Sequence, residues 1–441
     1  MYFRRRRPAT SEPRDRALEI PAFRKFLVAR SISWIGNSIT MVALPLLVFQ
    51  LTGSPALTGL TAAIEVAPYL VFGLPAGAVA DIWDRKRVMV GMGLTSGVVM
   101  ATIPLAHAFD LLSVPYVFAA AIIVSSLFVF FDAAAFGALP EIVGRDRIAS
   151  ATGSMVAVSS VINLAGPAGG GALAAAIGPA WAIGLDAVAY IVAALLTARV
   201  AWTPRLRAED DPRITTRRLA RDIGEGLRYI WQTRIIRWLT LIGAGASLSG
   251  GAVVGLTVVV AVQQLGMNDD DARIGLLYSA TAVGAFLMSM AIAWIQRTVP
   301  TGWITIGSLA ASWTAQVMWA YVTSIPVGLV ILMLFQAASS LTIMNGIIVR
   351  QSLAPDHLQA RVNTTARMIA WGGTPFGAMV GGLLAENSGT TFALLVCSLG
   401  TGAGLALGLV SGIWRVPRLS ELQESNMKNS DIKKTENKEN Q

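Results

Sequence analysis

The sequence predicts an all-α integral membrane protein with about twelve spanning helices, arranged as two six-helix bundles. Hydrophobic residues make up 54% of the 441 residues and charged residues only 14%, whereas a soluble domain carries about 25% charged residues. Apolar stretches of about 20 residues recur along most of the chain, and each is long enough to cross a bilayer as a helix. A weak internal repeat then divides these stretches into two sets of six.

The expected spans alternate with short loops. They lie near residues 26–50, 56–80, 88–108, 113–137, 150–177, 180–201, 236–262, 273–295, 302–322, 326–349, 362–385 and 390–413. Basic residues gather in every second loop, at Asp81 to Arg87, Arg145 to Arg147, Arg205 to Arg237, Arg297, and Arg350 to Arg361. The positive-inside rule places these loops and both termini in the cytoplasm. We therefore expect a multi-pass protein of the cell (inner or plasma) membrane.

Five segments follow from this pattern. They are a cytoplasmic tail (1–25), a first bundle (26–202), a cytoplasmic linker (203–235), a second bundle (236–415) and a polar tail (416–441). The second tail has few apolar side chains, so we expect it to be disordered. The linker carries apolar residues at helical spacing, namely Leu219, Ile223, Leu227, Ile230 and Trp231. This spacing predicts an amphipathic helix on the cytoplasmic membrane surface, with a solvated helical linker as the alternative.

Composition also argues against several classes of function. The net charge of +9 comes from basic loops between apolar runs, so membrane orientation explains it without nucleic acid. One cysteine, Cys397, allows no intrachain disulfide, and two histidines give no convincing metal site or nucleophile–base pair. The chain has no Gly-x-x-x-x-Gly-Lys-Ser/Thr phosphate loop. We expect neither an enzyme nor a bound metal or cofactor.

The stretch from Gly73 to Arg87 organises the first bundle. Gly73, Gly77 and Asp81 are four residues apart, so they share one helical face that is thin enough for another helix to approach. Asp81 lies where the helix leaves the membrane, and there it can face the positive N-terminal end of a neighbouring helix. Arg85 and Lys86 mark the cytoplasmic side, and topology alone could also explain them.

This stretch resembles the loop between the second and third helices of the major facilitator superfamily, whose pattern is Gly-x-Leu-x-Asp-Arg-x-Gly-Arg-Arg/Lys. Gly77, Asp81, Arg85 and Lys86 match the pattern, and two positions depart from it, Ile82 and Asp84. Residues 22–415 further resemble the drug, macrolide and enterobactin exporter branch of the superfamily. The matching stretches are Phe130-Phe131-Asp132 to Pro140-Glu141, Gly166-Pro167-Ala-Gly169-Gly170, and Gly226-Leu227-Arg228-Tyr229.

The two halves repeat one another weakly. Gly170-Gly171-Ala-Leu173 recurs as Gly381-Gly382-Leu-Leu384, and Pro140-Glu141 recurs as Pro355-Asp356. A twofold repeat of six-helix bundles is the major facilitator pattern, with the transport site between the halves near mid-membrane.

Proline and glycine occur together in span five and again in span eleven. The span-five group, Gly166, Pro167, Gly169 and Gly170, resembles the antiporter motif of the superfamily. Its counterpart in span eleven is Gly373, Pro375 and Gly377. A proline removes a backbone hydrogen bond and bends a helix, so we expect hinges here. The alternative is that small residues simply pack helices together.

Three acids lie inside spans, where a charge costs at least about 2.5–3.5 kcal/mol. Glu65 is the deepest, Asp132 lies in the cytoplasmic half of span four, and Asp186 lies in the outer half of span six. Removal from water favours the neutral form of a carboxyl, so Glu65 is the first candidate for proton coupling or cation binding. Asp132 and Asp186 are further candidates. Each of the three could instead be a structural acid.

Arg30, just inside span one, is a possible charge partner of Asp132, or it snorkels to the interface. Relatives often carry an acid where this chain has Asn37 and an arginine where it has Ala135. If those groups relay protons in the family, this chain must do so differently or not at all.

Polar and aromatic side chains inside the spans are candidates for the substrate pocket. They are Asn37, Tyr69, Gln336 and Asn345. An apolar cavity with one or two acids suits lipophilic, often cationic, compounds.

The resemblance therefore implies a secondary transporter that exports amphipathic small molecules, drug-like or siderophore-like, by proton antiport with alternating access. The expected partners are the substrate, protons and the lipid bilayer, and we expect a monomer. Import or facilitated diffusion of a specific metabolite is one alternative. A non-transporting membrane receptor or scaffold is another.

Overall fold

The fold was examined in a computed structural model, which describes residues 17–202, 216–355, 358–418 and 421. At some helical positions, among them 77–82 and 371, the backbone is described but not the side chain. Most of the two expected tails lies outside the described residues.

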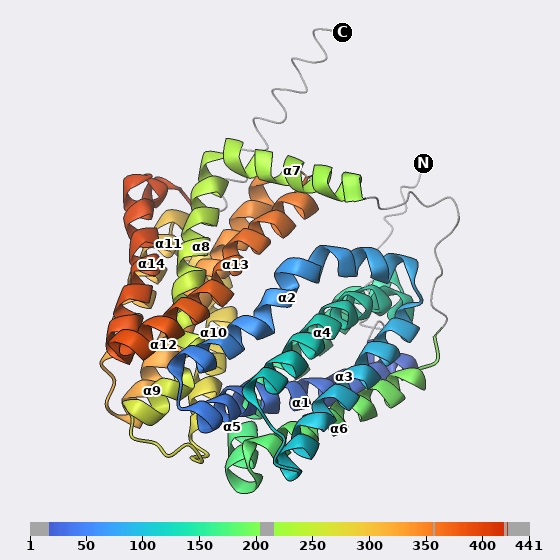
Figure 1. The fold of residues 1–441 in the computed structure, drawn as a ribbon. Coiled ribbons are helices and arrows are strands. Elements are labelled where there is room, and N and C mark those ends of the chain that lie inside the picture. Colours follow the sequence, from blue (N-terminus) through green and yellow to red (C-terminus); the bar gives the residue numbers. More distant parts are fainter. Residues whose placement is uncertain (1–16, 203–215, 356–357, 419–420, 422–441) are drawn as a thin grey trace, which may run out of the picture.

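Two groups of long helices stand side by side (Figure 1). The first half contains α1 (Pro21–Thr52), α2 (Pro55–Ile82), α3 (Arg85–Ala108), α4 (Val114–Val143), α5 (Ile148–Ile177) and α6 (Pro179–Ala198). The second half contains α8 (Arg234–Gly255), α9 (Thr257–Gln263), α10 (Ile274–Thr298), α11 (Thr301–Ala320), α12 (Ile325–Leu353), α13 (Gln359–Ser388) and α14 (Thr390–Val410). Helix α7 (Thr216–Gln232) joins the halves. The two six-helix bundles match the predicted fold class.

Eleven of the described helices are long and apolar enough to cross a membrane. The remaining long helix is α11, which occupies the predicted span 302–322 but does not meet that criterion. Its sequence places a stripe of polar residues at helical spacing, and all of them are buried: Thr301, Thr305, Ser308, Ser312 and Gln316. The Thr301 carbonyl and the side chains of the other four bond to α12 or α14, so the polar stripe faces protein.

The predicted span 236–262 differs from the structure, because it is divided into α8 and α9. Leu256 lies between them with φ −101° and ψ 3°, outside regular helical geometry. Glycines at 250, 251 and 255 precede the break and weaken the helix there. The break lets the short helix α9 turn its residues Val258 to Ala261 into the core, where they are fully buried.

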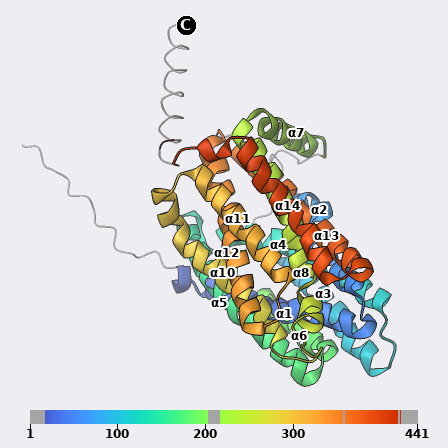
Figure 2. The same cartoon turned by 90° about the vertical axis from the view of Figure 1, so that its left-hand side faces the viewer.

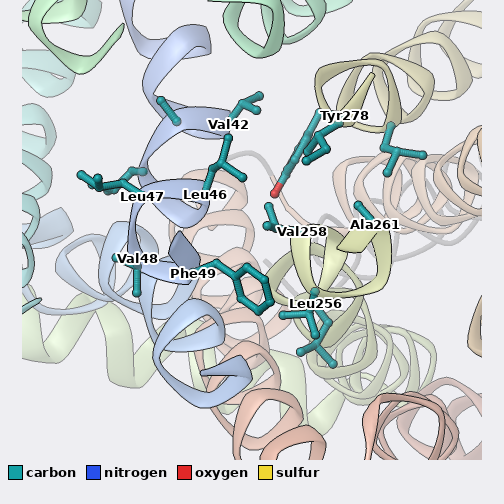
Figure 3. Packing of buried hydrophobic residues seen from close by; sticks show 14 of the residues in the cluster. Val42, Leu46, Leu47, Val48, Phe49, Leu256, Val258, Ala261 and Tyr278 are labelled. Atoms are coloured by element: carbon teal, nitrogen blue, oxygen red, sulfur yellow. The ribbon is translucent and has the colours of Figure 1, made fainter. Parts of the chain in front are cut away.

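The two ends of the bundle differ. One end, here called the α7 end, carries α7 and the segments leading to both termini, while the other, the opposite end, carries the α1–α2 loop (Figures 1 and 2). At the opposite end a buried apolar cluster joins the halves. In it, Leu46 and Phe49 of α1 face Leu256 and Val258 of the second half, beside Tyr278 of α10 (Figure 3). The ribbons of α2 and α13 diverge toward the α7 end (Figure 1).

Helix α7 packs on the second half through part of its surface. Ile230 is 1% exposed and lies in an apolar cluster with Ile236 and Val362, and the Tyr229 hydroxyl donates to the Leu353 carbonyl at 3.0 Å. Leu227 and Trp231, one turn apart, are exposed. The helix therefore has one apolar contact with the protein and a second apolar face left uncovered.

Candidate functional site

Glu65 lies at the junction of the two halves. It is the tenth residue after the start of α2, and at 1.5 Å per residue this places it about 15 Å along the helix, half the thickness of a bilayer core. Its neighbours on α2, Ala62 and Ala63, are buried against Ala378 of α13 in the second half. This acid therefore lies on a helix that packs against the other bundle at this depth.

Arg30 and Asp132 are brought together. Arg30 Nη2 of α1 donates to Asp132 Oδ1 of α4 at 3.2 Å. The arginine side chain is 6% exposed and the aspartate side chain 46% exposed. The guanidinium also lies 5.0 Å from the ring centres of both Trp34 and Phe131. A cation held by one carboxylate and two aromatic faces is fixed in position.

Asp186 is buried between α6 and α1. It is 1% exposed, and Thr40 Oγ1 donates to its Oδ2 at 2.5 Å. Its Oδ1 has no hydrogen-bond partner and lies against the Cα of Gly36, where any added Cβ would collide with it. The residue is thus placed within the first half, behind the face that meets the second half.

The basic turn at the α7 end forms a compact polar cluster. Arg85 Nη1 donates to Glu141 Oε1 at 2.6 Å and to the Gly137 carbonyl at 2.9 Å. Lys86 Nζ donates to the Val200 carbonyl at 2.9 Å and lies 5.4 Å from the ring centre of Trp202.

Asp84, a departure from the family pattern, has a local role. Its Oδ1 accepts from the backbone N–H groups of Lys86 and Arg87, at 2.9 and 3.1 Å, and so caps α3. Of Gly77 and Asp81 the structure describes only the backbone, near the end of α2. The surroundings of the Asp81 carboxyl are therefore outside the described part of the chain.

The glycines of the expected span-five hinge face different surroundings. A Cβ on Gly170 would lie 2.8 Å from Ile39 Cα, and one on Gly166 would collide with Ser38. A Cβ on Gly169 would meet nothing within 4 Å. In α13, a Cβ on Gly373 would lie 2.7 Å from the Ala244 carbonyl oxygen.

Several of these small residues therefore allow close packing. Gly377 resembles Gly373, because a Cβ there would collide with the Leu248 carbonyl. Helices α5 and α13 each run unbroken through their proline, Pro167 and Pro375 respectively.

The expected pocket residues separate into two groups. Asn37 and Tyr69 are exposed, and Gln336 is partly exposed with a long 3.4 Å contact to Ser340 Oγ. Asn345, in contrast, is 0% exposed. Its Nδ2 donates to the Thr301 carbonyl and Thr305 Oγ1 of α11, at 3.1 and 3.0 Å. Asn345 therefore joins α11 to α12 and does not lie at the junction of the halves.

Contacts between the halves concentrate at the opposite end. Gln50 Nε2 donates to the Asp269 carbonyl at 3.0 Å, and nearer mid-membrane the Ala168 N–H donates to Ser279 Oγ at 3.1 Å. Ser279 and Tyr278 of α10 both take part in the junction, and no feature of the sequence singles out Ser279. A serine in an apolar helix is common, so only its position opposite Pro167-Ala168 identifies it.

Among the described residues, no group of three or more His, Cys, Asp or Glu side chains is arranged to hold a metal ion.

Comparisons with known proteins agree with this architecture. The chain is 29% identical over 415 residues to the multidrug efflux pump Tap of Mycolicibacterium fortuitum, covering 90% of this chain and 96% of the pump. It is 28% identical over 400 residues to the enterobactin exporter EntS of Salmonella paratyphi A, covering 86% and 91%.

Solved structures show the same fold. A bacterial homologue of the human lysosomal transporter Spinster, in an inward-facing and occupied conformation, superposes with a TM-score of 0.71 at 13% identity, covering 88% of this chain and 96% of that one. The nucleoside transporter NupG superposes with a TM-score of 0.70 at 14% identity, covering 90% and 99%. Residues 16–439 match the transmembrane secretion effector family, and the chain belongs to this family of major facilitator transporters.

Proposed function

We propose that this protein exports amphipathic small molecules from the cell in exchange for protons, by alternating access, as a monomer. The observation that carries the proposal is the position of Glu65 at mid-membrane depth on α2, beside Ala62 and Ala63, which pack against Ala378 of the second half. A carboxyl at the junction of the bundles can change the contacts between them when it gains or loses a proton. The names of the relatives, a multidrug efflux pump and a siderophore exporter, support the substrate class.

The positive-inside rule gives the orientation in this proposal. The α7 end, with Arg85, Lys86 and Arg87, faces the cytoplasm, and the opposite end faces outward. In this proposal, supported by the packing of the halves against each other at the opposite end, the present arrangement corresponds to a state accessible from the cytoplasm. Substrate would enter from that side, with Asn37, Tyr69 and Gln336 as candidates for contact.

In this proposal Glu65 carries the proton that is exchanged for substrate. In the outward-accessible state Glu65 takes up a proton, which removes a charge from the membrane interior and favours return to the present state. Release of that proton to the cytoplasm restores the anion, which can attract a lipophilic cation. Arg30 and Asp132 remain paired within the first half and hold α1 against α4.

The test uses inverted membrane vesicles that contain the protein. The vesicles are energised, their interior acidity is followed with a fluorescent dye, and lipophilic cations, macrolides and siderophores are added in turn. We expect at least one compound to trigger proton release, and we expect Glu65→Gln to abolish the response. Asp110→Asn, which removes an exposed carboxyl from the α3–α4 loop, is the matched control and should respond as the parent does.

Three results would count against the proposal. A proton response that persists in Glu65→Gln would remove Glu65 from coupling. Saturable uptake without outward pumping would favour import or facilitated diffusion of a specific metabolite. A compound that binds but never crosses the membrane would favour a receptor or scaffold.

A further inference from the structure

The first turn of α2 is completed by a side chain from the other half of the protein. Ser54 caps the helix locally, because Leu57 N–H donates to Ser54 Oγ at 3.2 Å and Thr58 N–H donates to its carbonyl at 3.1 Å. Pro55 has no N–H to satisfy. The remaining donor, Ala56 N–H, donates to Glu386 Oε2 of α13 at 3.0 Å.

Glu386 also accepts a hydrogen bond from Ser54 Oγ. One carboxylate therefore binds a backbone N–H and a hydroxyl of the opposing bundle, at a helix N-terminus. That terminus carries a partial positive charge from the aligned peptide dipoles, which favours an anion. Hydrogen bonds to an ionised acceptor are stronger than neutral ones.

The helix crossing beside this contact consists of close backbone approaches and of small apolar side chains, such as Ala63 of α2 against Ala378 of α13. A Cβ on Gly59 would lie 2.5 Å from the Ala378 carbonyl oxygen, and a Cβ on Gly382 would lie 2.8 Å from the Pro55 carbonyl oxygen. The backbones of α2 and α13 thus touch directly. Such a contact is close but non-directional, and the Glu386 hydrogen bonds provide the directional part.

The second crossing between the halves lacks this arrangement. There α5 and α10 also meet through glycines, since a Cβ on Gly171 would lie 2.7 Å from Gly275 N. At the start of α10, however, no side chain caps the helix, and its first N–H bonds to the helix's own loop, because the Ile274 N–H donates to the Asp271 carbonyl at 3.1 Å. Of the described residues at these two crossings, only those at the α2–α13 crossing form a carboxylate cap between the halves.

We propose that Glu386 is a latch residue, which holds the outer end of the transporter closed by capping α2 from the opposing half. Opening the outer end requires the start of α2 to move away from α13. The hydrogen bond between the Ala56 N–H and Glu386 then breaks, and water takes the place of each partner. The inference rests on the alternating access of the proposed function but not on its substrate, direction or coupling ion.

The latch has an expected counterpart at the inner end. By its resemblance to the superfamily motif, Asp81 at the end of α2 is expected to face the start of α13. In one state, Glu386 of α13 would contact the start of α2. In the other state, Asp81 of α2 would contact the start of α13. Each accessible state would have one such contact formed and the other broken.

Thiol labelling measures how often the outer end opens. Cys397 is replaced by serine, and Val258, which is 0% exposed in the cluster between the halves, is replaced by cysteine. The rate at which an impermeant thiol reagent modifies Val258→Cys in proteoliposomes reports the population of the outward-open state, even when this is small. Glu386→Gln should raise that rate about tenfold, the effect of losing one charge-assisted hydrogen bond, while Asp110→Asn should leave it unchanged.

Equal, measurable labelling rates in the Glu386→Gln and parent proteins would overturn the latch. A general loosening of the fold is separated from the latch by a second pair of reporters. Cysteines replacing Arg87 and Arg297, both exposed at the α7 end, carry spin labels whose separation should decrease in Glu386→Gln as the inner end closes. A broadened distribution without that decrease would also contradict the proposal.

A covalent version tests the same contact in the opposite direction. The protein carrying both Ser54→Cys and Glu386→Cys is treated with a short bifunctional reagent that joins the two thiols through reducible disulfides. The labelling rate of Val258→Cys should then fall toward zero and recover when the cross-link is reduced. Undiminished labelling in the cross-linked protein would overturn the latch. None of these three measurements uses a substrate or a proton gradient, so failure of the export proposal would not affect the result.

Discussion

Arg30 Nη2 lies 3.2 Å from Asp132 Oδ1 and connects α1 to α4 within the first half. The arginine is almost fully buried, between the rings of Trp34 and Phe131. A cation in this position needs its carboxylate, since the aromatic faces alone compensate only part of the lost hydration. The pair thus holds together two helices of the first half.

Removing the acid of this pair should destabilise the protein. We expect Asp132→Asn to lower the free energy of unfolding by about 1–3 kcal/mol, below the range for fully buried pairs because Asp132 is half exposed. Unfolding in mixed detergent micelles measures the change. Glu225→Gln, which breaks the exposed pair of Arg221 and Glu225 in α7, should cost less than about 0.5 kcal/mol. Similar losses in the two variants would contradict the structural role of Asp132.

The glycines of α5 allow packing and bending to be tested separately. Gly170→Ala and Gly171→Ala force a Cβ against Ile39 and Gly275, at 2.8 and 2.7 Å, and each should lower the free energy of unfolding by about 1–3 kcal/mol. Gly169→Ala meets nothing within 4 Å, so it should leave stability equal or raised.

The transport rate of Gly169→Ala then decides the hinge hypothesis. If bending at Pro167 needs a flexible neighbour, this variant should transport several-fold more slowly while remaining fully folded. Transport at the parental rate would leave the α5 glycines with a packing role alone.

Asn345 and Gln336 of α12 should respond differently to substitution. Asn345→Leu removes the buried donor that joins the Thr301 carbonyl and the Thr305 hydroxyl of α11 to α12, which should cost about 1–3 kcal/mol of unfolding free energy. Gln336→Leu should leave stability nearly unchanged and alter the apparent affinity for substrate. Thermal unfolding and transport assays on both variants provide the comparison, and a reversed pattern would exclude Gln336 from substrate contact.

Asp81 and Asp84 form a matched pair for testing the inner gate. Asp81→Asn should lower transport while membrane insertion stays intact, because a neutral amide interacts more weakly with a helix N-terminus. Asp84→Asn should be nearly neutral, since asparagine caps a helix about as well as aspartate. Unchanged transport in Asp81→Asn would remove this residue from gating.

Much of the architecture could be predicted because the membrane restricts it. An apolar stretch such as 113–137 must be helical in a bilayer, since its backbone has no water to bond with. Local chemistry also sufficed for some side chains, as with Arg30 and Asp132, two charges at similar depth in spans one and four. The interruption at Leu256 could not be predicted. The apolar residues Val258 to Val260 fit a continuous membrane helix as well as they fit a separate short one.

The same limit applies to the polar residues of the second half. Asn345 is a single polar residue in an apolar span, which is typical both of a ligand contact and of a helix–helix bond. The polar stripe of α11 favours the helix–helix bond over the ligand contact, but only once α11 is known to lie beside α12. Asp84 was a departure from a family pattern, and its capping role depends on the backbone geometry at the start of α3.

The sequence by itself determined the order of the spans, their expected orientation and the approximate depth of each charge, because hydropathy and the positive-inside rule act on each segment separately. The tertiary structure decided where the span 236–262 is interrupted and which side chains meet. Glu65 was placed on α2 beside residues that pack against α13, Asp186 was buried against α1, and Glu386 was joined to Ala56, which lies 330 residues away along the chain. Such contacts depend on the rotation and crossing of whole helices, which are set by packing over many residues rather than by any local pattern.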